Sequence, residues 1–192
     1  MLQLQEMGCH NINLVTPTHW TPSIVRALRT AVTGGLHIPL VYNCGGYESL
    51  EALRLLDGVI DIYLPDFKYM NPAIAAKFSS GAWDYPEVAA AAITEMYRQV
   101  GDLVLDENGI ALRGLMIRHL VLPNNLSGTD VFVRFVADKA GRSTYVNLLS
   151  QYRPECEASR YPELSRPITR QEYSQAVAWA REAGLTNLHL QA

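Results

Sequence analysis

The chain has 192 residues, of which 48% are apolar, with a formal net charge of −3 and three cysteines. This length and apolar content predict a single domain, residues 1–192, with a sizeable core, and the weak negative charge argues against a nucleic-acid or anionic-membrane partner. No apolar run approaches the roughly 20 residues that cross a bilayer. The first ten residues, MLQLQEMGCH, lack the basic and apolar segments of a signal peptide. We therefore expect a cytoplasmic protein with no membrane segment.

Strands and helices alternate in the predicted elements of the first half. Residues 1–7 resemble the last turns of a helix that ends at a glycine. Apolar runs predict strands at 11–15, 38–42 and 59–64. The helix between the first two strands starts at Thr21, the expected N-cap, and Pro22. A helix over about 50–56 follows the second strand, and two helices, near 72–78 and 87–100, form one long connection after the third.

The second half begins with a hairpin at 103–112, indicated by the Asn-Gly pair at its turn. A strand is predicted at 115–122, and Ser127 is the expected cap of a helix over 131–137. A further strand spans 143–149. Residues 154–168 show no clear period and are expected to form a loop laid over the domain, and Thr169 and Glu172 form a capping box for the last helix. We thus divide the chain into βα units over 1–153 and a loop, a helix and a short strand (188–190) over 154–192.

Repeated βα units predict a mostly parallel α/β sheet, either a barrel or an open doubly wound sheet. In both architectures the carboxyl ends of the strands form the reactive edge. Polar residues and glycines follow nearly every predicted strand, which favours a ligand site there over isolated loop residues. The candidates for this site are Thr16, Thr18, His19, Asn43, Gly45, Gly46, Asp66, Lys68, His119 and Gln151.

Single residues of this set allow more than one interpretation. Lys68 follows Asp66 by two residues, so their side chains share one side of an extended chain. They form either a simple ion pair or a cation offered to an anionic ligand. His119 is either a hydrogen-bonding group for a ligand or a core histidine with satisfied nitrogens. A metal centre of His19, Asp66 and His119 has no supporting ligand spacing.

Four phrases carry a family resemblance: GCHNINLVTPTH (8–19), VYNCGGYESLEALRLLDGVIDIYLPDFKY (41–69), RGLMIRHLVLPNN (113–125) and YVNLLSQYRP (145–154). With them the chain resembles the radical S-adenosylmethionine superfamily, in the branch related to the activating enzymes of pyruvate formate-lyase. The resemblance implies a partial (β/α)6 barrel that binds S-adenosylmethionine and a [4Fe-4S] cluster at the carboxyl ends of its strands. Reductive cleavage of S-adenosylmethionine then gives a 5′-deoxyadenosyl radical, and the implied partner is a glycyl-radical enzyme or another protein substrate.

The chain departs from this family in its cysteines. The family's cluster motif, C-x3-C-x2-C, is absent, and the three cysteines are far apart in sequence. We therefore expect a fragment that lacks the family's first strand and cluster loop and cannot bind the cluster alone. Residues 16–19 also replace the Gly-Gly-Glu that many members carry there. The resemblance implies cofactor roles for Thr16, Thr18, His19, Asn43 and Asp66, and more weakly for Lys68, His119 and Gln151.

Three functions therefore remain open at this point. The first is a remnant of an activating-enzyme-like radical enzyme, whose complete form cleaves S-adenosylmethionine. The second is a cluster-free module that binds a nucleoside or pairs with another chain. The third is an unrelated metal-dependent hydrolase barrel.

Overall fold

The computed structural model describes residues 1–190, and its central feature is a seven-stranded sheet. Six strands run parallel, in the spatial order β1-β2-β3-β5-β6-β7, and β4 pairs antiparallel with β5. The strands are β1 (Ile12–Val15), β2 (Leu40–Cys44), β3 (Ile62–Phe67), β4 (Val104–Leu105), β5 (Ala111–Leu120), β6 (Tyr145–Leu149) and β7 (Leu188–Leu190).

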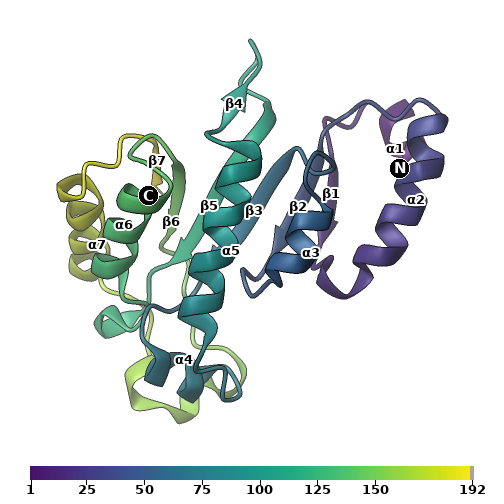
Figure 1. Ribbon diagram of the computed structural model, residues 1–192. Helices are drawn as coiled ribbons and strands as arrows, with labels where there is room; N and C mark the ends of the chain where they lie inside the picture. The colour runs from purple at the N-terminus through teal and green to yellow at the C-terminus, as the bar shows by residue number, and fades with distance from the viewer. Residues whose placement is uncertain (191–192) are drawn as a thin grey trace.

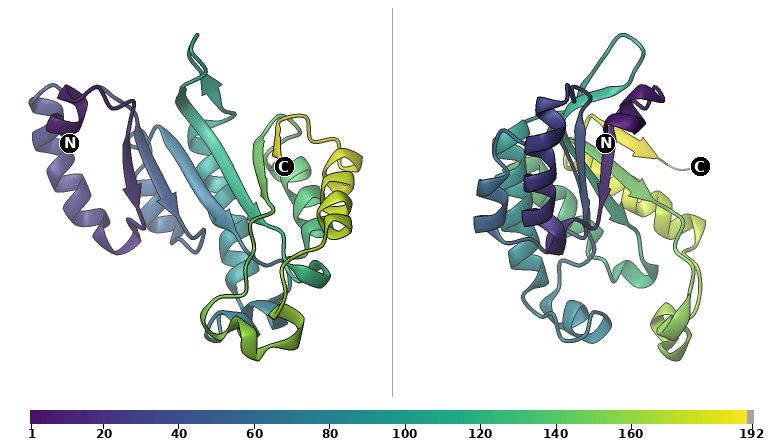
Figure 2. Two further views of the ribbon diagram at one scale, coloured as in Figure 1. Left: turned by 180° about the vertical axis from the view of Figure 1, so that it is seen from behind. Right: turned by 90° about the vertical axis from the view of Figure 1, so that its right-hand side faces the viewer.

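The parallel strands follow one another in chain order, which is the winding of a barrel and not of a doubly wound sheet, whose order reverses. Each crossover then returns on the same side, so α2, α3, α5 and α6 lie on one face of the sheet (Figures 1 and 2). The sheet stays open: within residues 1–190, β1 pairs only with β2 and β7 only with β6. The helices are α1 (Leu2–Glu6), α2 (Thr21–Thr33), α3 (Leu50–Leu55), α4 (Pro72–Phe78), α5 (Tyr85–Val100), α6 (Thr129–Lys139) and α7 (Arg170–Glu182).

Alternation along the strands separates a buried helix face from a half-exposed open face. On β3, Tyr63 and Phe67 are fully buried toward the helices, whereas Leu64 and Asp66 between them are only partly buried. On β5, Ile117 and His119 are fully buried, and Arg118 between them is partly exposed. Successive side chains of a strand point to opposite faces, so Asp66 and Arg118 belong to the open face.

Two predicted helix caps are wrong. A short 3-10 helix over Thr18–Trp20 leads directly into α2, so Thr21 is already helical and its hydroxyl donates to the carbonyls of Pro17 and Thr18. Gly128 is the N-cap of α6, and the buried Ser127 hydroxyl accepts from the Leu122 amide instead. A hydroxyl near a helix start is compatible with either arrangement, because both leave it beside free backbone groups.

The second strand of the predicted hairpin and the following strand are one element, β5, which continues through Gly114. Gly114 has φ 122°, and a Cβ there would lie 2.4 Å from the carbonyl oxygen of Asp102. The capping box of Thr169 and Glu172 is confirmed at the start of α7. The predicted loop contains two short 3-10 helices, Cys156–Arg160 and Pro162–Leu164. No helix among the described residues has the length and apolar character needed to cross a bilayer.

Candidate functional site

Four side chains join the carboxyl ends of β2, β3 and β5 on the open face. The register pairs Asp66 with Arg118, so the two side chains lie side by side. Arg118 donates from Nε to Asp66 Oδ1 over 2.7 Å and from Nη2 to the amide oxygen of Asn43 over 2.8 Å. Lys68 Nζ donates to the other carboxylate oxygen of Asp66 over 2.9 Å. We call Asn43, Asp66, Lys68 and Arg118 the edge cluster.

The loops that carry the edge cluster are joined by Gly46 and Tyr85. Gly46 has φ +81°, and a Cβ there would lie 2.3 Å from the carbonyl oxygen of Asp66, so only glycine permits this approach. The buried Tyr85 hydroxyl lies 3.0 Å from the carbonyl oxygens of Gly45 and Asp66, to which it donates, and accepts from the Lys68 amide. Burial raises the pKa of Tyr85 above its ordinary value, which keeps this donor protonated. Packing of the loop against β3 thus explains Gly46, whereas a Cβ on Gly45 would meet only Lys68 Nζ, at 4.0 Å.

Thr18 and the residue Glu48, which was not among the candidates, connect the loops that follow β1 and β2. Glu48 is 3% exposed. Its carboxylate accepts hydrogen bonds from the Thr18 hydroxyl over 2.7 Å and the Tyr42 hydroxyl over 3.0 Å. The Thr16 amide donates to the Asn43 carbonyl and so extends the pairing of β1 with β2 by one hydrogen bond. Thr16 itself has φ 51°. His19 is exposed beside Trp20.

The structure places His119 in the core, apart from the edge cluster. It is fully buried on the helix face and stacked on Phe132, with ring centroids 4.1 Å apart. One ring nitrogen lies 2.8 Å from the Phe67 carbonyl oxygen and the other 2.9 Å from the Thr129 hydroxyl. Burial lowers the pKa of His119 from 6.5 to about 4. Of the two interpretations offered by the sequence, the geometry matches the core histidine.

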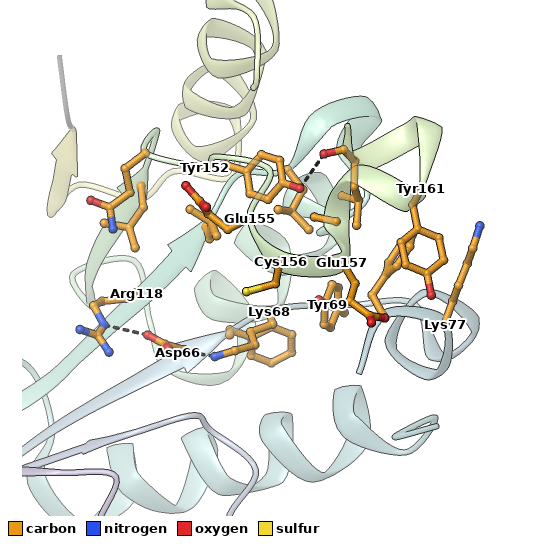
Figure 3. Close-up of a pocket in the computed structure, with 18 of the residues that line it drawn as sticks. Asp66, Lys68, Tyr69, Lys77, Arg118, Tyr152, Glu155, Cys156, Glu157 and Tyr161 are labelled. Carbon is orange, nitrogen blue, oxygen red and sulfur yellow. Dashed lines mark hydrogen bonds and ion pairs between the residues drawn. The ribbon is translucent and has the colours of Figure 1, made fainter. Parts of the chain in front are cut away.

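A cavity of about 770 Å³ opens beside the edge cluster, over the carboxyl ends of β3, β5 and β6 (Figure 3). Asp66, Lys68 and Arg118 line its inner end, and Gln151 lines it from the end of β6. The segment 154–164 covers it and contributes Glu155, Cys156, Glu157, Ala158, Tyr161 and Leu164 to the lining. We call this segment the roof. The candidates Asn43, Gly45, Gly46, Thr16, Thr18 and His19 do not line the cavity.

Polar contacts fasten the roof at its carboxyl end. Lys77 of α4 forms an ion pair with Glu163, and the Tyr152 hydroxyl donates to the Leu164 carbonyl over 2.8 Å. Beyond the roof, the Glu172 carboxylate accepts from Arg166 and from the backbone amides of Asn124 and Thr169. The Arg166 guanidinium holds the pKa of Glu172 well below its usual range.

The cysteines do not fit an iron–sulfur cluster. Cys9 is partly buried, Cys44 is buried and Cys156 is exposed, and they lie near β1, in β2 and in the roof. Burial, followed by the nearby Glu48 carboxylate, raises the pKa of the Cys44 thiol, which opposes the thiolate form that iron requires. Residues 1–190 include no group of three His, Cys, Asp or Glu side chains placed to hold a metal ion. The hydrolase alternative loses its support, since His119 uses both nitrogens in the core.

Sequence reasoning gave too little weight to Arg118, Glu48 and Tyr85. The position of Arg118 on the open face could have been read from the sequence, because Arg118 is the chain neighbour of the apolar Ile117 and neighbours on a strand point to opposite faces. The contacts of Glu48 and Tyr85 with strand-end loops have no local sequence signal, since Tyr85 reaches partners 17 to 40 residues away.

Comparison with known structures addresses the fold. A crystal structure of a domain of pyruvate-formate lyase-activating enzyme from Bacteroides vulgatus superposes with a TM-score of 0.61, covering 95% of this chain and 98% of that one at 12% identity. The chain has an activating-enzyme-like α/β fold. The predicted fold class, a partial barrel with an open, mostly parallel sheet, is thereby confirmed.

In sequence the chain is similar to an uncharacterized protein of Methanocaldococcus jannaschii. It is 31% identical over 166 residues, which are 86% of this chain and 44% of the relative. The chain thus spans less than half the length of that protein. No family model matches the chain.

Proposed function

We propose that this chain forms the S-adenosylmethionine-binding part of a radical enzyme of the activating-enzyme type. The observation that carries the proposal is the edge cluster, which lies at the carboxyl ends of neighbouring parallel strands. In open and closed α/β sheets these ends are where ligands bind. The fold shared with the Bacteroides vulgatus domain supports the same assignment.

The side chains at this edge have the chemistry that S-adenosylmethionine requires. Asp66 and Asn43 offer oxygen atoms, suited to ribose hydroxyls and to the amino group of the methionine part. Lys68 and Arg118 donate to the Asp66 carboxylate and hold it in place. Thr16, Thr18 and His19 continue the edge over β1, as the family resemblance implies. When bound, the cofactor would supply the radical precursor, and these residues would orient it.

The cluster is not assigned to these residues, because the cysteines of the chain do not fit it. In a complete enzyme of this type the cluster thiolates would have to come from outside the 192 residues. The partner that the resemblance suggests, a glycyl-radical enzyme or other protein substrate, rests on the resemblance alone.

Calorimetric titration of the purified chain with S-adenosylmethionine tests the binding. We expect saturable 1:1 binding with a Kd between about 10 μM and 1 mM. Asp66→Asn should weaken it roughly tenfold, as expected for a lost hydrogen bond to a charged group. Asp138→Asn changes an exposed carboxylate of α6 and is the matched control. No saturation up to about 5 mM by a chain whose circular dichroism shows it folded would overturn the proposal.

The cluster-free nucleoside-binding module remains a second candidate, because it would use the same edge. Anaerobic reconstitution with iron and sulfide separates the two functions. We expect no brown chromophore from this chain, and a chromophore with 5′-deoxyadenosine formation from a longer protein that includes a C-x3-C-x2-C segment. A longer protein that binds S-adenosylmethionine but never cleaves it under reducing conditions would favour the module.

A further inference from the structure

The inner end of the cavity carries an uncompensated positive charge. Lys68 and Arg118 share the single carboxylate of Asp66, and the three side chains are 42%, 30% and 31% exposed. Within residues 1–190, Nη1 of Arg118 has no hydrogen-bond partner, and Nζ of Lys68 has Asp66 as its only one. These cationic donors remain available to a ligand. A single negative charge would balance them.

The position of these donors is fixed before any ligand arrives. Asn43 and Asp66 hold two nitrogens of the Arg118 guanidinium, so its plane cannot rotate freely. The Tyr85 hydroxyl holds the backbone amide of Lys68. A preorganised cation pair binds an anion with a smaller loss of side-chain entropy than two mobile side chains do.

The middle of the cavity is apolar and aromatic. Leu120 of β5, Leu122 just after that strand and Leu149 of β6 form part of the lining. Tyr152 and Tyr161 belong to the roof side (Figure 3). A volume of about 770 Å³ falls in the usual range for small-molecule sites. The lining therefore suits a ligand with a body larger than an inorganic ion.

Three further charged side chains line the cavity: Glu155 and Glu157 of the roof, and Lys77 of α4. Glu157 pairs with Arg160 and Lys77 pairs with Glu163, whereas Glu155 has no ion-pair partner in the described part of the chain. The cationic donors that remain for an anion are therefore those of Lys68 and Arg118. They orient a bound anion with its head toward Lys68 and its body under the roof.

We propose that this cavity binds a small organic monocarboxylate with an apolar or aromatic body, held through its carboxylate by Lys68 and Arg118. The binding site stands on the cavity geometry alone. Its role as the substrate pocket of a radical enzyme rests on the function proposed above. Under that role a small acid would be the reacting substrate, in place of the protein substrate that the family resemblance implies.

Cys156 provides a reporter for the test. Its thiol lies in the cavity lining, with the sulfur on the side that faces Asp66 and Lys68 (Figure 3). Cys44 is buried and Cys9 is partly buried, so in a Cys9→Ser background Cys156 is the accessible thiol. Protection of Cys156 from a thiol-specific reagent then measures occupancy of the cavity without S-adenosylmethionine.

Three probes separate the head from the body: 3-phenylpropanoate, its neutral amide 3-phenylpropanamide, and acetate. We expect 3-phenylpropanoate to protect Cys156 saturably, and both other probes to need at least about tenfold higher concentration. Lys68→Met should weaken protection by 3-phenylpropanoate roughly tenfold. Lys139→Met, which removes an exposed lysine at the end of α6, should leave it unchanged.

Equal protection by the acid and the amide would overturn the proposal, as would equal behaviour of Lys68→Met and Lys139→Met. Absence of protection by any probe up to about 10 mM would also overturn it, provided that circular dichroism shows a folded chain. Failure here is distinguishable from failure of the proposed function, because S-adenosylmethionine binding is titrated separately by calorimetry. A chain that binds S-adenosylmethionine but not the acid loses only the present inference.

Discussion

The two faces of the central sheet use the same strands for different purposes. On the helix face, Phe67 and His119 are fully buried, and Phe67 packs on Phe132 with ring centroids 5.2 Å apart. On the open face, their immediate chain neighbours Asp66 and Arg118 form a partly exposed ion pair of 2.7 Å. One step along a strand therefore separates a side chain of the core from a side chain of the candidate site, since alternation sends neighbouring side chains to opposite faces.

The largest expected effect is on stability, and it tests the comparison of the two faces directly. Phe67→Ala should lower the free energy of unfolding by about 3–5 kcal/mol, because it leaves a cavity in the aromatic cluster of the helix face. Asp66→Ala, one residue away, should lower it by at most about 1 kcal/mol, since partly exposed ion pairs contribute little. Urea unfolding followed by circular dichroism measures both. Similar losses for the two variants would show that the faces are energetically alike.

The next effect concerns pH and His119. Burial lowers the pKa of His119 from 6.5 to about 4, so between these values the unfolded chain binds a proton that the folded chain excludes. Stability therefore falls as the pH falls through 6.5, by about 2 kcal/mol between pH 7 and pH 5.

The measurement is the urea midpoint at each pH. His119→Gln should flatten the pH dependence over this interval, whereas His189→Gln, an exposed histidine of β7, should retain it. An unchanged slope in His119→Gln would contradict the core assignment.

The smallest difference between paired variants is expected at the loop that carries Gly46. Gly46→Ala would place a Cβ 2.3 Å from the Asp66 carbonyl oxygen, whereas Gly58→Ala, also at positive φ, meets nothing within 4 Å. Both substitutions strain the backbone by about 1 kcal/mol, and the clash should add about 1–2 kcal/mol to the first alone. Gly46→Ala should also weaken S-adenosylmethionine binding by moving Asp66. Equal free energies of unfolding for the two variants would show that the loop moves away from the Asp66 carbonyl at no cost in stability.

The fold was largely predictable, because the order of apolar runs and the punctuation by glycine and proline follow from local chemistry. The capping box at Thr169 is one such local signal. The strand-end position of Asp66 was likewise predictable. His119 is a wrong candidate for the edge site and Arg118 a correct one, although both lie near the end of β5. Alternation distinguishes them, because His119 shares the buried face of the strand with Leu115 and Ile117.

Long-range features were beyond the sequence. The roof has no periodic pattern, and its place over the cavity depends on contacts such as Lys77 with Glu163. The helix starts near Thr21 and Ser127 were misjudged because a hydroxyl satisfies either the N-cap or a neighbouring backbone group. Tertiary packing decides where such helices begin, and the residues next to the helix start determine it only in part.

The carboxylate of Glu172 has a consequence for ligand exchange. It joins Arg166, the Asn124 amide and the start of α7 in one set of hydrogen bonds, and its lowered pKa keeps it ionised through neutral and mildly acidic solution. Acidification over that range therefore leaves these hydrogen bonds in place, just beyond the carboxyl end of the roof. If the cavity binds an acid, its rates of entry and departure should accordingly not change in mild acid. Glu172→Gln should change them, because it weakens the hydrogen bonds next to the roof.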